Sequence, residues 1–86
     1  MKHAGPSALD RLEPLLLLVR SFPGFKEKRR GVFYWRSRAC LHFHEDGGDL
    51  WADLRPPGES DFTRLSADGT TAHAAILARL KAISAA

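Results

Sequence analysis

Side chains that can bind a metal or act as a nucleophile recur at every second position from Cys40 to His44. In an extended strand, alternate residues point to the same face, so Cys40, His42 and His44 would lie in one row. Zinc accepts two imidazoles, a carboxylate and a water molecule, and Asp53 on a neighbouring strand could supply the carboxylate. A His-x-His pattern is weakly specific, and the same residues fit a histidine–carboxylate pair that only satisfies polar groups.

Catalysis has less support than metal binding. Cys40 and His42 have the residue types of a thiol nucleophile and its base, but their Cα atoms would lie about 7 Å apart on one strand. The sequence contains no G-x-S-x-G, no glycine-rich phosphate loop and no H-E-x-x-H. We therefore expect a protein that is not an enzyme, in which Cys40 packs as a small apolar residue. A lone cysteine cannot form an internal disulfide, which favours the cytoplasm.

Two helices are expected to flank these residues. Leucines and a valine at helical spacing predict an N-terminal helix that stops at Phe22–Phe25, where a proline and a glycine follow each other. We expect residues 1–6, before that helix, to be disordered. Ile76, Leu80 and Ile83 predict a second helix over residues 70–84.

The central part of the chain changes to a period of two, which predicts four strands between residues 32 and 65. The expected fold is a single α+β domain over residues 1–86. It has an N-terminal helix, a four-stranded antiparallel meander and a C-terminal helix, with both helices on one face of the sheet.

The pairing of these strands assigns their faces. A two-residue turn at Asp46-Gly47, or at Gly47-Gly48, places Leu41 and Phe43 on the core face. A turn at Arg36-Ser37 is expected to place Val32 and Tyr34 there as well. The open face would then carry Cys40 and a ligand- or partner-binding surface composed of Phe33, Trp35, Arg38, His42, His44, Trp51 and Asp53. Because such a patch of aromatic side chains is costly to leave exposed, a homodimer or a protein partner is expected to cover it.

The formal net charge is +3, and its excess is local. The segment Lys26–Arg30 contains four cations, Lys26, Lys28, Arg29 and Arg30, which could attract phosphate groups. Together with the sheet aromatics they could form a nucleic-acid interface, although the acidic residues of the central hairpin would repel a phosphate backbone. No apolar run approaches the ~20 residues that span a bilayer, so we expect no membrane partner.

The motifs G-V-F-Y (31–34), R-S-R-A (36–39), L-H-F-H-E-D (41–46) and A-D-L-R (52–55) resemble those of a family of small bacterial proteins. That family has no assigned activity, so the resemblance implies no reaction. The G-V-F…R…H-x-H-x-D…D pattern is also similar to a bacterial and fungal domain labelled "luciferase". The element order is similar to that of YjbR-type, frataxin-like α-β-α domains, for which DNA binding has been proposed.

Three functions remain open from the sequence. The first is a binding or interaction module without a cofactor that uses the open face of the sheet. The second is a metal- or small-ligand-binding protein, in which His42, His44 and Asp53 would hold zinc. The third is a nucleic-acid-binding module that uses Lys26–Arg30 and the sheet aromatics.

Overall fold

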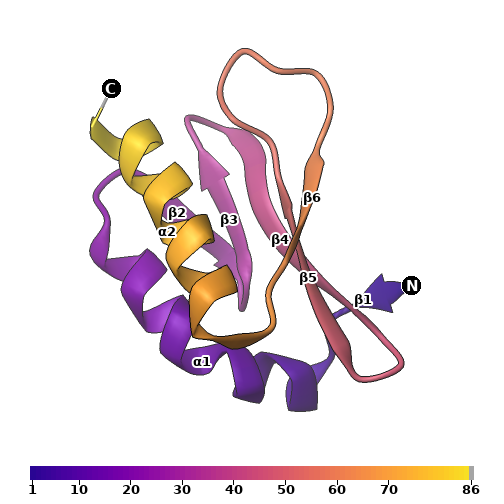
Figure 1. The fold of residues 1–86 in the computed structure, drawn as a ribbon. Coiled ribbons are helices and arrows are strands. Elements are labelled where there is room, and N and C mark those ends of the chain that lie inside the picture. Colours follow the sequence, from indigo (N-terminus) through magenta and orange to yellow (C-terminus); the bar gives the residue numbers. More distant parts are fainter. Residues whose placement is uncertain (86) are drawn as a thin grey trace.

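A computed structural model describes residues 1–85, which form two helices and an antiparallel sheet. The helices are α1 (Pro6–Ser21) and α2 (Gly69–Ala85), and the strands are β1 (Lys2–His3), β2 (Phe25–Arg29), β3 (Val32–Trp35), β4 (Arg38–Asp46), β5 (Asp49–Leu54) and β6 (Thr63–Ser66). The strand order is β2-β3-β4-β5-β6, and β1 pairs with β4 (Figure 1). The α+β class is confirmed, but the expected number of strands is wrong, because the sheet has six strands and not four.

The segment Lys26–Arg30, which lies before the four expected strands, is largely edge strand β2. Its side chains alternate, with Phe25 and Glu27 half-buried and Lys26 and Lys28 exposed. The alternation is hard to recognise in the sequence because a glutamate occupies an inward position. Glu27 can occupy it because its carboxylate accepts hydrogen bonds from Arg20 at 2.6 and 3.0 Å. Exposed cations on such an edge discourage pairing with another chain.

Residues 2–5, within the segment expected to be disordered, contact β4 in the structure. Lys2 and His3 pair with Glu45 and His44 of β4, and the amide of Ala4 donates to the carbonyl of Phe43 at 3.0 Å. The Gly5 amide then donates to Glu45 Oε2 at 2.7 Å. These bonds attach β1 to the part of β4 that β3 does not reach.

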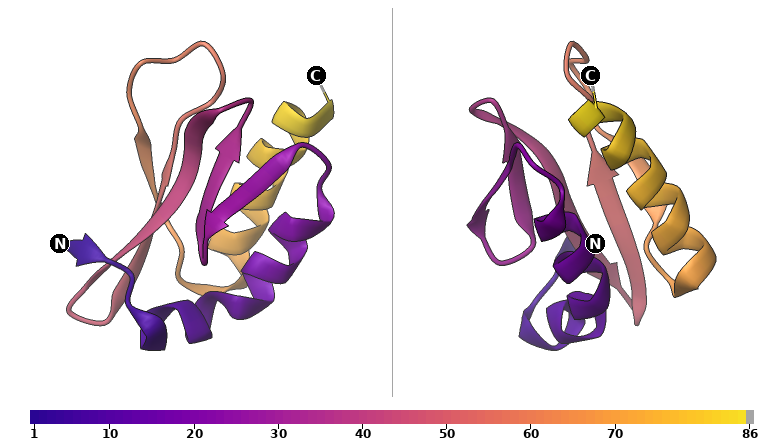
Figure 2. Two further views of the ribbon diagram at one scale, coloured as in Figure 1. Left: turned by 180° about the vertical axis from the view of Figure 1, so that it is seen from behind. Right: turned by 90° about the vertical axis from the view of Figure 1, so that its left-hand side faces the viewer.

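Both helices contribute an apolar stripe to one core. Ala8, Leu12, Leu15, Leu16 and Val19 of α1 are buried together with Ile76, Leu80 and Ile83 of α2 and the inner face of the sheet. Pro14 lies inside α1 and removes one backbone donor there. Seen from behind, strands β2 and β3 lie in front of α2, while α1 changes direction along its length (Figure 2). Among residues 1–85, no helix combines the length and the apolar character that crossing a bilayer requires.

The central hairpin follows one of the two expected registers. Its turn is Gly47-Gly48, whose φ angles of 57° and 93° suit glycine. Leu41 pairs with Leu54 and Phe43 pairs with Ala52, and all four residues are buried in the core. His42 and His44 therefore lie on the opposite, open face, as the alternation predicts.

The face assignment of β3 is wrong, because β4 contains a β-bulge at Cys40. Phe33 pairs with Leu41 while its neighbour Tyr34 pairs with Ala39, so Cys40 is an extra residue on β4. The bulge shifts the alternation by one position. Phe33, expected on the open face, is consequently only 1% exposed in the core, whereas Val32 and Tyr34 are half-buried. Cys40, also expected on the open face, is buried as well.

Candidate metal centre

Three histidines meet on the open face of the sheet. His42 and His44 come from alternate positions of β4, and β1 places His3 directly beside His44. The ring centroid of His3 lies 4.5 Å from that of His44 and 5.8 Å from that of His42. One nitrogen from each ring can be chosen so that all three lie within 4.8 Å of one another. We call these three residues the histidine cluster.

The two inner histidines have polar atoms without partners. The Nδ1 atoms of His42 and His44 are buried, and neither makes a hydrogen bond to any described residue. Buried polar atoms of this kind cost free energy unless something binds them. Burial lowers the pKa of both imidazoles below the ordinary value of 6.5, and the negative charge of Asp53 opposes this only in part. Near neutral pH both rings are therefore uncharged, which is the form that binds metal ions.

Asp53 lies next to the histidine cluster but has a different main partner. It is 6% exposed, and Arg64 of β6 donates to both of its carboxylate oxygens at 2.8 Å. These hydrogen bonds hold the pKa of Asp53 below its ordinary value of 3.8. Asp53 Oδ2 lies 3.1 Å from Nδ1 of His44, although the two groups are not aligned for a hydrogen bond. Asp53 is thus a fixed negative charge beside the imidazoles, and it already forms a salt bridge with Arg64.

An aromatic ring closes one side of the cluster. The ring of Phe62, from the segment that precedes β6, packs edge-on against His42 with a centroid distance of 4.7 Å. Arg55 in turn lies over the ring of Phe62, with its Cζ atom 4.6 Å from the ring centroid. Trp51, half-buried, pairs with His44 across the β4–β5 ladder. His42 and His44 are therefore held by packing, whereas His3 is exposed.

The structure separates the residues of the expected binding surface. His42, His44, Trp51 and Asp53 lie together, but Phe33 is in the core. Trp35 and Arg38 pair with each other at the β3–β4 turn, at the opposite end of β4 from the histidines.

The cations of the expected nucleic-acid site are not equivalent. Arg30 donates to Asp10 and Glu13 of α1, at 2.9 Å in both cases, so its charge is neutralised locally. Lys26, Lys28 and Arg29 are exposed along the outer edge, and the Nζ atom of Lys28 lies 5.4 Å from the ring centroid of Tyr34.

Sequence reasoning missed His3 and Arg64 as members of this site. A two-residue strand has no periodicity to detect, so nothing in Lys2–His3 reveals its pairing with β4. Arg64 could have been found, because an arginine in the last strand and an aspartate in the preceding one form an ordinary cross-strand charge pair.

No protein-family model, curated protein or solved structure was found to match the chain.

Proposed function

We infer that the chain is a metal-binding module that takes one late first-row transition ion, with Zn²⁺ as the probe of choice, through His3, His42 and His44. The observation that carries this proposal is the convergence of three imidazole nitrogens within 4.8 Å on one sheet face. Imidazole is a preferred ligand of zinc, copper and nickel. This keeps the expected His42 and His44 as ligands and puts His3 in the place expected for Asp53.

The separation of the nitrogens is compatible with closure on an ion. At Zn–N distances near 2.0–2.1 Å, tetrahedral ligand atoms lie about 3.4 Å apart. The nitrogen atoms, now up to 4.8 Å apart, therefore have to approach one another by up to about 1.4 Å. His3 can make this movement because it is exposed and belongs to a two-residue edge strand. Binding through Nδ1 of His42 would also satisfy a buried atom that otherwise makes no hydrogen bond.

Asp53 favours a cation at the histidine cluster, whereas Arg64 and the N-terminal ammonium group act against it. Asp53 supplies a negative charge 3.1 Å from His44, and Arg64 balances part of it. Metal-ligating histidines commonly have such a carboxylate in their surroundings, where it orients the ring and increases its basicity. Asp53 is therefore proposed to support the site and not to ligate the ion.

The broader function as an aromatic interaction surface has less support. Phe33 is buried in the core, and Trp35 lies at the other end of β4 from Trp51. The aromatic side chains therefore do not form one continuous patch. We prefer metal binding because its residues are adjacent.

Titration of the metal-free protein with Zn²⁺, followed by calorimetry and by the imidazole NMR signals, tests the proposal. We expect one ion per chain and simultaneous shifts of the signals of His3, His42 and His44. His3→Ala should weaken binding by at least about tenfold, since even indirect partners of metal ligands contribute that much. This variant removes an exposed side chain, so it should fold as the parent does.

The fourth histidine provides a matched control. His73 of α2 contacts the carbonyl of Ala67 at 2.7 Å and lies outside the histidine cluster. His73→Gln should bind Zn²⁺ as tightly as the parent. Absence of binding, or an equal loss in His3→Ala and His73→Gln, would contradict the proposal.

A further inference from the structure

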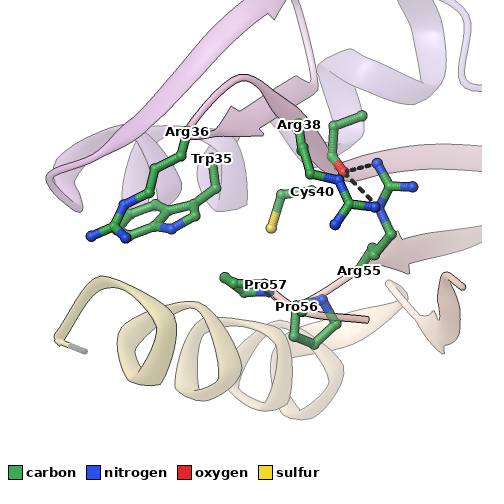
Figure 3. A pocket seen from close by; sticks show the side chains of 9 residues that line it. Trp35, Arg36, Arg38, Cys40, Arg55, Pro56 and Pro57 are labelled. Carbon is green, nitrogen blue, oxygen red and sulfur yellow. Dashed lines mark hydrogen bonds between the residues drawn. The ribbon is translucent and has the colours of Figure 1, made fainter. Parts of the chain in front are cut away.

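A second feature, independent of the histidine cluster, is a cavity beside the β3–β4 turn. Its volume is about 120 Å³, and its lining includes Trp35, Arg36, Arg38, Cys40, Arg55 and Pro57 (Figure 3). The arginines reach it from three places, which are the β3–β4 turn, the start of β4 and the residue after β5. The sulfur of Cys40 points toward Pro57 across the cavity. We call this cavity the arginine pocket.

The charges in the arginine pocket have no carboxylate partners among residues 1–85. Arg11, Arg20, Arg30 and Arg64 each form an ion pair elsewhere in the molecule, with N–O distances of 2.6 to 3.6 Å. None of the three pocket arginines has a carboxylate within 4.0 Å in the part of the chain that the structure describes. The guanidinium groups of Arg38 and Arg55 lie side by side, whereas that of Arg36 lies over the ring of Trp35, with its Cζ atom 5.4 Å from the ring centroid (Figure 3). Positive charges around one cavity without a carboxylate partner create a local potential that attracts anions.

One of these guanidinium groups is held in place before any ligand binds. Arg55 donates through Nε and Nη2 to the carbonyl of Ala39 at 3.2 and 2.8 Å. Its Cζ atom also stacks over the ring of Phe62 at 4.6 Å. A group fixed in this way loses little conformational entropy when an anion binds. Arg36 and Arg38 are exposed, and the guanidinium of Arg38 lies beside that of Arg55 (Figure 3). Arg36 can close over a ligand from the other side of the cavity, where Trp35 lies.

The pocket also has an apolar wall. The ring of Trp35 packs directly against the backbone at Gly24, which has a φ of +95°. The contact is so close that a Cβ atom at this position would lie only 2.3 Å from the ring. Phe25 packs against the same ring at a centroid distance of 5.0 Å. Trp35, Arg36 and Pro57 also line an adjoining cavity of about 340 Å³ that reaches Ala82 and Ile83 of α2. An apolar group bound beside Trp35 would therefore have room to extend.

We propose that the arginine pocket binds a small organic oxyanion, whose phosphate or carboxylate group is held by Arg36, Arg38 and Arg55 and whose apolar part lies against Trp35 and Pro57. Guanidinium groups bind both oxyanions through paired, charge-assisted hydrogen bonds. The aromatic and proline walls suit a planar apolar group. This proposal does not depend on metal binding, because none of these residues belongs to the histidine cluster.

Fluorescence of a Trp51→Phe variant tests the proposal, since Trp35 is then the only tryptophan in the chain. Phenyl phosphate, benzoate and inorganic phosphate serve as probes. We expect phenyl phosphate or benzoate to change the Trp35 emission saturably and to bind more tightly than inorganic phosphate. The tighter of the two aromatic probes identifies the preferred oxyanion. Arg38→Gln should weaken binding about tenfold or more, as loss of a charged hydrogen bond does.

Arg79→Gln is the matched control, because Arg79 is an exposed arginine of α2 outside the pocket. It should change the affinity less than about twofold, since it removes only a distant, screened charge. An equal loss in Arg38→Gln and Arg79→Gln would indicate unspecific attraction and overturn the proposal. Equal affinities for inorganic phosphate and phenyl phosphate, or no saturable change in emission, would overturn it as well.

Discussion

At the scale of single residues, the environment of Cys40 differs most from the one that its sequence neighbours suggest. It stands two residues before His42, yet the bulge buries it to 1% exposure and separates it from the imidazoles. Desolvation raises the pKa of its thiol to about 11, and the nearby positive charge of Arg55 offsets this only in part. The thiol is therefore a packing group and not a nucleophile.

This environment predicts slow alkylation of Cys40. With a pKa of about 11, the thiolate fraction at pH 8 is roughly two orders of magnitude below that of an ordinary cysteine. Iodoacetamide is a suitable reagent because it is neutral and is not attracted by the pocket arginines. The rate should keep rising between pH 8 and pH 10, where that of an ordinary thiol levels off. Rapid labelling of the native protein at pH 8, equal to that in denaturant, would contradict the assignment.

At the scale of elements, the bulge decides which side chains of β3 support the core. Phe33 is 1% exposed, whereas the adjacent Tyr34 is half-buried on the other face. Phe33→Ala should therefore lower the free energy of unfolding by about 3–5 kcal/mol, and Tyr34→Ala by clearly less. Urea denaturation measures both.

If Phe33→Ala fails to fold, Phe33→Leu gives a milder test, with an expected loss of about 1 kcal/mol. Equal losses for corresponding substitutions at Phe33 and Tyr34 would mean that the bulge does not set the faces as described.

The same elements show how far sequence reasoning extends. Helix positions, the central hairpin and the shared face of His42 and His44 follow from periodicity and from the need of Gly47-Gly48 for positive φ. The bulge at Cys40 could not be predicted, because an extra residue leaves no mark in composition. Strand β2 could not be recognised in the sequence because Glu27, which is paired with Arg20, occupies an inward position. The alternating pattern of a strand predicts an apolar residue at such a position. His3 reaches the candidate site only through long-range pairing, which a local pattern does not encode.

At the scale of the whole molecule, the two candidate sites use different parts of β4 and share one core, and the ring of Phe62 lies against His42 of one and Arg55 of the other. The histidine cluster includes β1 and the second half of β4, while the arginine pocket uses the β3–β4 turn and the residues after β5. Buried residues of both helices and of the sheet form a single cluster between them. Neither site has a core of its own, so both depend on the same folded state.

One core predicts one unfolding transition. At about 0.05–0.15 kcal/mol per residue, a chain of 86 residues has an expected stability of roughly 4–13 kcal/mol. Such a small domain unfolds cooperatively when no part of it has a hydrophobic core of its own. Trp35 reports on the arginine pocket and Trp51 on the histidine cluster. Each of the variants Trp51→Phe and Trp35→Phe keeps one tryptophan, whose fluorescence can be followed in urea. For each variant, we expect the midpoint from this fluorescence to equal the midpoint from circular dichroism. A Trp51 signal that changes well before the helical signal would show instead that the β1–β4 end opens separately, and the histidine cluster would then form only part of the time.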